Sequence, residues 1–179
     1  MCLLLAPCLC LAADEASERV EIRSAFVDTG QEVLQLSARL DFVLPEGARR
    51  AVGEGAALTL DLQFEVRRAR RYWLDETVAA LGQHYEISYH ALSERYLLRN
   101  LNSGEQSAYA SLDAALQQLS GIGALPALDR ALLDPEQPYE ARLRATLDIH
   151  NLPETLRWVL FWTDNWRQTS DWYVWPLKL

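Results

Sequence analysis

Residues able to take part in acid–base or nucleophilic catalysis are few in this sequence and widely spaced. His84 and His90 lie in a stretch of alternating polar and apolar residues. A straight strand would hold them roughly 20 Å apart, too far to chelate one metal. Asp148 and His150 would share a strand face, but no nucleophile is indicated beside them. Ser88 would share a face with His90, although this spacing does not reliably place a hydroxyl against an imidazole.

A catalytic site is therefore the less favoured interpretation. The enzymatic alternative is a hydrolase, or a lipid- or glycan-modifying enzyme, with His90, Asp148 or His150 in a cleft. No pair of acidic residues is held by its spacing in the way that glycosidic acid–base chemistry requires. The glycines of GEGAA and GIGALP lack the third glycine and the preceding strand that define a phosphate-binding loop. We expect no enzyme activity, no cofactor and no metal site.

A cluster of arginines is the strongest local charge. The stretch LTLDLQFEVRRARRYW, residues 58–73, alternates regularly and then carries four arginines within five positions. Guanidinium groups bind phosphate and carboxylate bidentately, and the adjacent aromatics suit a membrane interface. The alternative is a solvated strand end whose charge is paired with nearby acidic residues. The candidate binding residues of this arginine cluster are Arg67, Arg68, Arg70, Arg71, Tyr72 and Trp73.

Tryptophan is concentrated near the C-terminus. Five of the six tryptophans lie between Trp158 and Trp175. We expect most of them to be buried, because large rings at helical or strand spacing usually stabilise a core. Trp166 is surrounded by polar residues, so it is added to the candidate binding surface.

Composition and charge restrict the class of protein. The chain has 179 residues, of which 50% are hydrophobic, and its net charge is −8. The length suits one domain, and the acidic balance argues against nucleic acid as a partner, since phosphate binding needs a dominant basic field. All three cysteines, Cys2, Cys8 and Cys10, lie at the start of the chain, so disulfides and thiolate chemistry are not expected after it.

The first residues resemble an export signal. The sequence MCLLLAPCLCLAADEASE contains an apolar run that ends in small residues and is too short to span a bilayer. No Lys or Arg precedes the run, which favours a true start further upstream, and Pro7 before Cys8 fits a lipoprotein site poorly. The alternative is a buried N-terminal segment of a cytosolic protein. We predict a signal peptide at 1–13 and one β-rich domain at 14–179.

Period-two alternation is the main structural signal in the rest of the chain. Long amphipathic strands with one polar face are typical of antiparallel sheets. Strands are expected at 20–27, 33–42, 58–66, 85–89, 95–100, 107–110, 139–150 and 171–175, the last ended by Pro176. Short helices are expected at 45–55, 111–119 and 153–162, and 121–138 reads as a long connection. The predicted fold is mainly β: an antiparallel β-sandwich or strongly curved sheet of about 7–8 strands with two or three short helices.

The order of several motifs resembles one known family. RARRYWLDE, YEISYHALSERYLL, SLDAALQQL, LDIHNLPETLR and SDWYVWPL together resemble the proteobacterial domain-of-unknown-function 4390 family over nearly all of the chain after the signal. The resemblance implies an exported protein, encoded beside a sensor kinase in many members, and it supplies no catalytic residues.

Three functions are compatible with these features. The first is a non-enzymatic periplasmic or membrane-associated binding module, whose partner is another envelope protein such as the extracytoplasmic part of a sensor kinase. Contact with a membrane surface, that of the inner membrane in particular, is compatible with it. The second is the hydrolase described above. The third is a carrier that holds an apolar ligand between its sheets.

Overall fold

Two antiparallel sheets make up the described part of the protein. The structure, a computed structural model, describes residues 20–68, 76–150 and 166–179. The smaller sheet has the strand order β1-β2-β7 and comprises β1 (Val20–Asp28), β2 (Val33–Phe42) and β7 (Gly121–Asp129). The larger sheet has the order β10-β8-β3-β4-β5-β6, and β9 also pairs with β8. Its strands are β3 (Ala57–Arg68), β4 (Glu76–His90), β5 (Arg95–Asn100), β6 (Gln106–Tyr109), β8 (Tyr139–His150), β9 (Arg167–Thr169) and β10 (Tyr173–Leu177).

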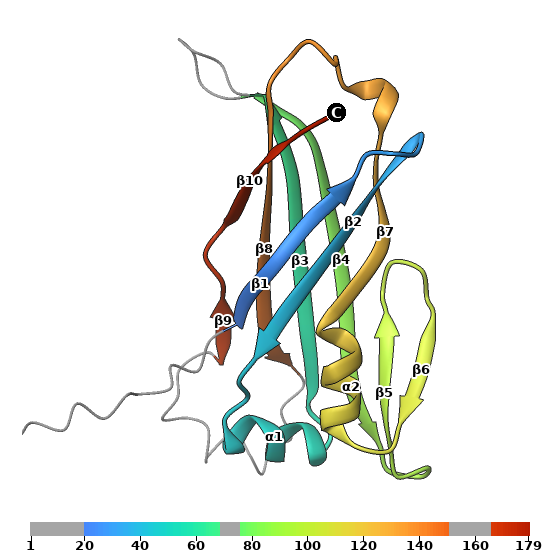
Figure 1. Ribbon diagram of the computed structural model, residues 1–179. Coiled ribbons are helices and arrows are strands. Elements are labelled where there is room, and N and C mark those ends of the chain that lie inside the picture. The colour runs from blue at the N-terminus through green and yellow to red at the C-terminus, as the bar shows by residue number, and fades with distance from the viewer. Residues whose placement is uncertain (1–19, 69–75, 151–165) are drawn as a thin grey trace, which may run out of the picture.

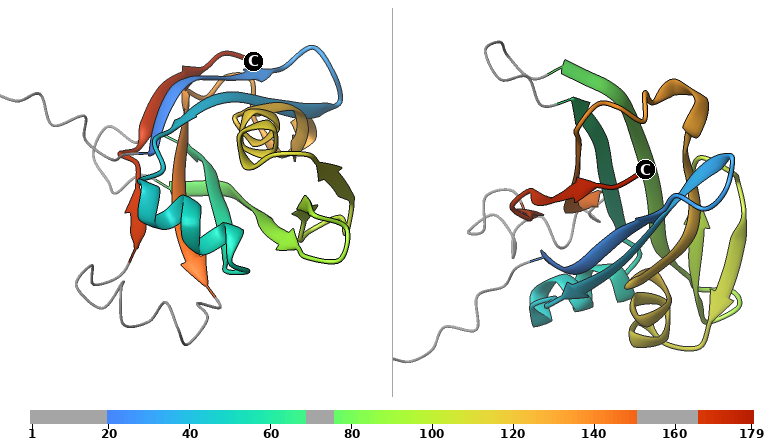
Figure 2. Two further views of the ribbon diagram at one scale, coloured as in Figure 1. Left: turned by 90° about the horizontal axis from the view of Figure 1, so that it is seen from below. Right: turned by 45° about the horizontal axis from the view of Figure 1, so that its top comes forward.

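The smaller sheet covers one face of the larger one. In Figure 1, β1 and β2 cross in front of β3, β4 and β8, and Figure 2 shows the two layers from other directions. The inward residues of β2, β3 and β8 are buried in a single core, as the alternation predicts. On β8, every second residue from Tyr139 to Ile149 is buried and the residues between them are not. The predicted mainly β, antiparallel fold is confirmed.

Two short helices and one 3₁₀ turn occur among the described residues. Helix α1 (Glu46–Gly53) follows Pro45 and joins β2 to β3, as predicted. Helix α2 (Leu112–Leu119) joins β6 to β7 and confirms the helix expected at 111–119; the Ser111 hydroxyl caps it by accepting a hydrogen bond from the Ala114 amide at 3.2 Å. The 3₁₀ turn covers Arg130–Leu132. The helix expected at 153–162 and the signal expected at 1–13 lie outside the described residues.

Two sequence-based expectations about strands are wrong. Residues 121–129 form β7 rather than part of a long connection; two register shifts against β2 break the alternation that would have revealed the strand. Strand β10 continues through Pro176 instead of ending before it. An edge strand tolerates proline because its outer N–H needs no ladder partner, and β10 is at the edge of its sheet.

Candidate binding site

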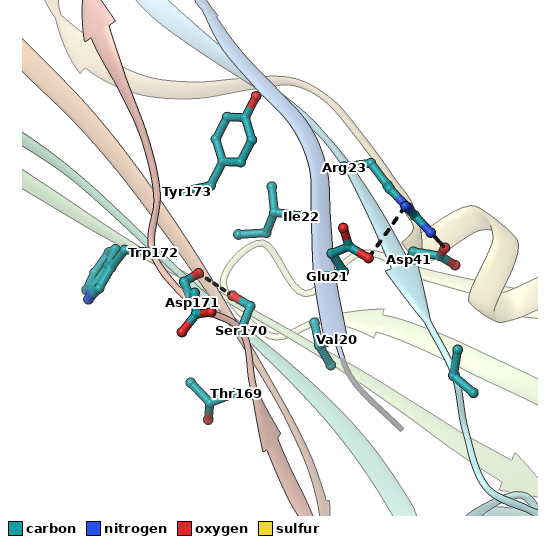
Figure 3. A pocket seen from close by; sticks show the side chains of 11 residues that line it. Val20, Glu21, Ile22, Arg23, Asp41, Thr169, Ser170, Asp171, Trp172 and Tyr173 are labelled. Carbon is teal, nitrogen blue, oxygen red and sulfur yellow. Dashed lines mark hydrogen bonds and ion pairs between the residues drawn. The ribbon is translucent and has the colours of Figure 1, made fainter. Parts of the chain in front are cut away.

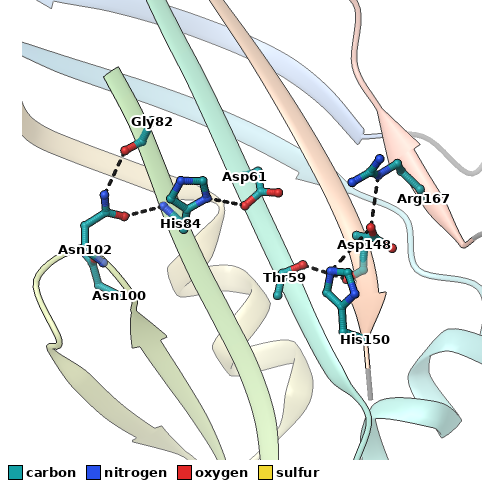
Figure 4. Close-up of polar contacts among 9 residues, drawn as sticks. All are labelled: Thr59, Asp61, Gly82, His84, Asn100, Asn102, Asp148, His150 and Arg167. Atoms are coloured by element: carbon teal, nitrogen blue, oxygen red, sulfur yellow. Dashed lines mark hydrogen bonds and ion pairs between the residues drawn. The ribbon is translucent and has the colours of Figure 1, made fainter. Parts of the chain in front are cut away.

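The outer face of the larger sheet is covered by paired polar side chains. Arg142 Nε donates to the Glu65 carboxylate at 2.9 Å, and Arg144 Nε donates to the Gln63 amide oxygen at 3.1 Å. Figure 4 shows two further groups on this face. These pairs link β8 to β3 across the sheet, so this face is consistent with a solvated surface whose charges compensate one another.

The histidines and acids of the enzymatic alternative are divided between separate places. The Asp148 carboxylate forms an ion pair with Arg167 Nε at 3.2 Å and lies 3.6 Å from His150 Nε2 (Figure 4). His90 instead contacts the Ser93 hydroxyl at 2.9 Å, in the turn after β4. In the strand register, Asp148 on β8 lies two strand spacings from Glu86 on β4, and His90 lies four residues further along β4. This offset corresponds to roughly 16 Å between His90 and Asp148. The structure therefore assembles Asp148 with His150 but does not add His90 to them.

His84 forms a contact that sequence reasoning did not anticipate. Its Nδ1 lies 2.6 Å from the Asp61 carboxylate on the neighbouring strand, and its backbone N–H donates to the Asn102 side chain at 2.8 Å (Figure 4). The imidazole is half exposed and lies above Gly82, where the absence of a side chain leaves room for it. Only the β3–β4 register, which places Asp61 opposite His84, could have revealed this pair.

The described members of the arginine cluster lie at the end of β3. Arg67 and Arg68 are half-buried, and Arg68 forms an ion pair with Glu76 at the start of β4. The hydrogen bond and charge of Glu76 raise the pKa of Arg68. This ion pair agrees with the alternative given above, in which nearby acidic residues pair with the charge of the cluster. The other members, Arg70, Arg71, Tyr72 and Trp73, lie outside the described residues, so the cluster as a contact surface stays a prediction.

Trp166 and Trp172 are placed differently. Trp166, a predicted contact residue, is half-buried and packs against the core. Trp172 lies on the outer face of the larger sheet, where the Arg142 and Arg144 guanidinium carbons lie 4.2 and 4.6 Å from its ring centroid. Trp172 thus fixes the segment before β10 to the outer face of β8 through two cation–π contacts.

An open cleft separates the edges of the two sheets on the side where β1 and β10 lie. Its volume is about 810 Å³. Figure 3 shows β1 on one side of it and the segment from β9 to β10 on the other. We call it the β1–β10 cleft, and it is lined by Val20, Glu21, Ile22, Arg23, Asp41, Val43, Thr169, Ser170, Asp171, Trp172 and Tyr173.

The charges of the β1–β10 cleft are mostly negative. Arg23 is the one basic residue in the lining, and its guanidinium lies 2.7 Å from Asp41 and 3.5 Å from Glu21. The hydrogen bond to Asp41 and the charge of Glu21 raise the pKa of Arg23. Asp171 on the opposite wall has no side-chain partner among the described residues, so the lining carries three carboxylates against one guanidinium. This arrangement suits a ligand with positive charge.

Ser170 shapes the second wall of the cleft. Its backbone N–H donates to the Ala145 carbonyl at 2.8 Å, and its hydroxyl accepts the Ala145 N–H at 3.0 Å. The same hydroxyl donates to the Asp171 carbonyl at 2.9 Å (Figure 3). The hydroxyl replaces a backbone partner at the break between β9 and β10, so the chain bends there and leaves the Asp171 carboxylate exposed in the cleft.

Sequence analysis did not identify the residues of this cleft. In the strand expected at 20–27, Glu21 and Arg23 alternate with the apolar Val20 and Ile22, but a polar face is common to every strand of such a sheet. The informative property is that β1 and β10 are both edge strands, and this depends on pairings distant in sequence.

Two further properties concern the described residues alone. No group of three or more His, Cys, Asp or Glu side chains among them is arranged to hold a metal ion. No helix within 20–68, 76–150 or 166–179 combines the length and apolar character needed to cross a bilayer.

Fold and site together define a mainly β protein of two packed antiparallel sheets with an acidic cleft at one open side. Within that class, the chain belongs to the family described as domain of unknown function (DUF4390), whose model matches residues 17–176. This match confirms the family resemblance of the sequence motifs. Neither the comparison with curated proteins nor that with solved structures found a match.

Proposed function

We propose that the protein is an exported, non-enzymatic binding module that holds an extended segment of a partner protein in the β1–β10 cleft. The observation that carries this proposal is the pair of free strand edges beside the cleft. In the described chain, β1 pairs only with β2, and β10 pairs only with β8. A free strand edge presents unpaired N–H and C=O groups, and strand addition uses these groups to bind an extended peptide.

The lining of the cleft suggests the chemistry of the bound segment. The lining has three carboxylates, those of Glu21, Asp41 and Asp171, and one guanidinium, that of Arg23, so its net charge is negative. The whole chain also has a net charge of −8. The buried side chain of Ile22 and the half-buried ring of Tyr173 add apolar contacts (Figure 3). An added strand presents its side chains to alternate faces. The proposed partner segment therefore alternates basic residues with apolar ones.

The compartment is inferred from the sequence. The apolar run at 3–13 supports export to the periplasm, and the lack of cysteine after Cys10 agrees with it. Association with the inner membrane is part of the same proposal. The partner class that follows is another envelope protein, such as the extracytoplasmic part of a sensor kinase. The arginine cluster is a second proposed contact, for an acidic partner surface or for the membrane.

The test uses peptides of defined charge rather than an unidentified partner. An eight-residue peptide that alternates Lys with Val, and its Glu–Val counterpart, are added to ¹⁵N-labelled protein, and amide exchange is followed by NMR. We expect the basic peptide to slow exchange in β1 and β10 and to shift residues 20–23 and 169–173. Asp171→Lys should weaken this binding several-fold, whereas Glu54→Lys, an exposed change just after α1, should leave it unchanged.

Two results would overturn the proposal. One is equal binding of the acidic peptide, because the cleft would then not select by charge. The other is the absence of any protection in β1 and β10 with the basic peptide, because strand addition requires those edges.

A further inference from the structure

A second cleft opens at the opposite edges of the two sheets, between β7 and β6. Its volume is about 350 Å³, within the range of small-molecule sites. We call it the β6–β7 cleft, and helix α2 lies at its end with Gln118 and Leu119. The remaining lining comes from β4 to β6 and from β7: Tyr85, Leu98, Asn100, Glu105, Ser107, Tyr109 and residues 121–126.

The floor of the β6–β7 cleft is aromatic and apolar. Tyr85, Leu98 and Tyr109 are half-buried, and they lie on the inner face of the larger sheet, on β4, β5 and β6. Neither phenol hydroxyl forms a hydrogen bond with another described residue. A buried or half-buried tyrosine hydroxyl usually finds a partner, so these two are available to a ligand.

One charged side chain faces this floor. Glu105 is the single charged residue in the lining, and its carboxylate accepts a hydrogen bond from Ser103 at 3.3 Å. Burial and the charge of Glu105 raise the pKa of Tyr85, so this phenol remains neutral. The same effect shows that the Glu105 carboxylate is near enough to Tyr85 to interact with it electrostatically. Electron-rich rings beside a carboxylate attract cations, through the ring face and through the charge.

The opposite wall has an irregular backbone. Gly121 and Gly123 have open space where a Cβ would lie, and Ala124 has a φ of 50°, which is unusual for a residue with a side chain. The Ala124 N–H donates to the Ser37 hydroxyl at 3.2 Å, where β7 shifts register against β2. Strained backbone of this kind concentrates at binding sites, and this outlier lines the cleft.

We propose that the β6–β7 cleft binds a small organic cation, an amine carried on an aromatic or aliphatic body. The body lies on Tyr85, Leu98 and Tyr109, and the ammonium group faces the Glu105 carboxylate. Both phenol hydroxyls remain available as acceptors for its N–H groups. This site is separate from the β1–β10 cleft, so the proposal does not depend on the proposed function.

The test compares two probes of nearly equal shape and opposite charge. The cation 2-phenylethylammonium and the anion 3-phenylpropanoate are titrated into ¹⁵N-labelled protein at equal ionic strength. We expect saturable amide shifts with the cation at Ser107, Gly121 and Gly123, and none with the anion. Glu105→Gln should weaken cation binding about threefold to fivefold, the effect expected of one exposed ion pair.

A pair of neighbouring variants separates occupancy of the cleft from a general effect on β6. Ser107→Phe places a ring on the inner face, because Ser107 pairs with Leu98, and it should abolish binding. Ala108→Phe places the same ring on the outer face of the strand and should leave binding unchanged. Both positions are exposed, so both variants should fold.

Any of three results would overturn the proposal: equal binding of the anion, unaltered cation binding in Ser107→Phe, or no saturable shift at the three reporter amides up to the solubility limit of the probe.

Discussion

Replacing Trp172 with alanine should destabilise the protein through loss of its contacts on the outer face of β8. The Arg142 and Arg144 guanidinium carbons lie 4.2 and 4.6 Å from the ring centroid of Trp172. Each cation–π contact contributes about 0.5–1 kcal/mol at an exposed site, so the two together contribute about 1–2 kcal/mol. The indole is half-buried, and removing it costs about another 1 kcal/mol of apolar burial. We expect the free energy of unfolding to fall by about 2–3 kcal/mol.

Urea denaturation followed by far-ultraviolet circular dichroism measures this change. Trp172→Phe keeps an aromatic face and should lose only about 1 kcal/mol. Lys178→Ala, an exposed change in the same C-terminal segment, should stay within about 0.5 kcal/mol of the unmodified protein. A double-mutant cycle between Trp172→Ala and Arg144→Met should give a coupling of about 0.5–1 kcal/mol.

The reasoning about Trp172 would be refuted by a loss of less than about 0.5 kcal/mol in Trp172→Ala. A coupling of zero with Arg144 would refute the cation–π assignment even if the alanine variant were destabilised, because burial alone would then explain the loss.

Three other predictions concern a buried hydroxyl, a strained backbone position and a phenol. Ser170→Ala should lower the free energy of unfolding by about 1–3 kcal/mol, because a buried N–H of β8 loses its acceptor; an unchanged urea midpoint would contradict this. Ala124→Gly should raise the free energy of unfolding by about 0.5–1 kcal/mol by relieving the positive φ, whereas Ala108→Gly in β6 should lower it by a similar amount; equal signs for the two would disprove the strain. Tyr85 should titrate above the ordinary phenol value of 10.0, because burial and Glu105 disfavour the phenolate. Its contribution to stability is therefore complete below that value and is lost as the pH rises through the raised pKa; absorbance at alkaline pH measures the titration, and normal titration of every tyrosine would contradict it.

The long strands were predictable because apolar and polar residues alternate in their sequence as buried and exposed positions alternate in the sheet. The core side chains of β3 and β8 recur at every second residue, because one face of each strand packs in the core and the other faces solvent. Helix α2 was predictable for a local reason, since the Ser111 hydroxyl caps a turn only three residues away.

The irregular strands were not predictable from the same pattern. Strand β7 contains Pro126 and two register shifts, so its inward residues do not alternate regularly. Strand β9 has three residues, too few for any periodicity to be recognised. Both strands depend on pairing with longer neighbours, β2 and β8, rather than on their own sequence.

The candidate site divides in the same way. The sequence by itself determined which residues of β1 are polar and which are apolar, and it determined that the chain as a whole is acidic. Only the tertiary structure decided that β1 and β10 are sheet edges on the same side and that Asp171 lines the same cleft as Glu21, Arg23 and Asp41. The physical reason is that alternation is a property of neighbouring residues along the chain, whereas an edge is defined by the strand that fails to pair there. Which edges meet at the cleft follows from the packing of β1 against β8 and β10, more than a hundred residues later in the chain.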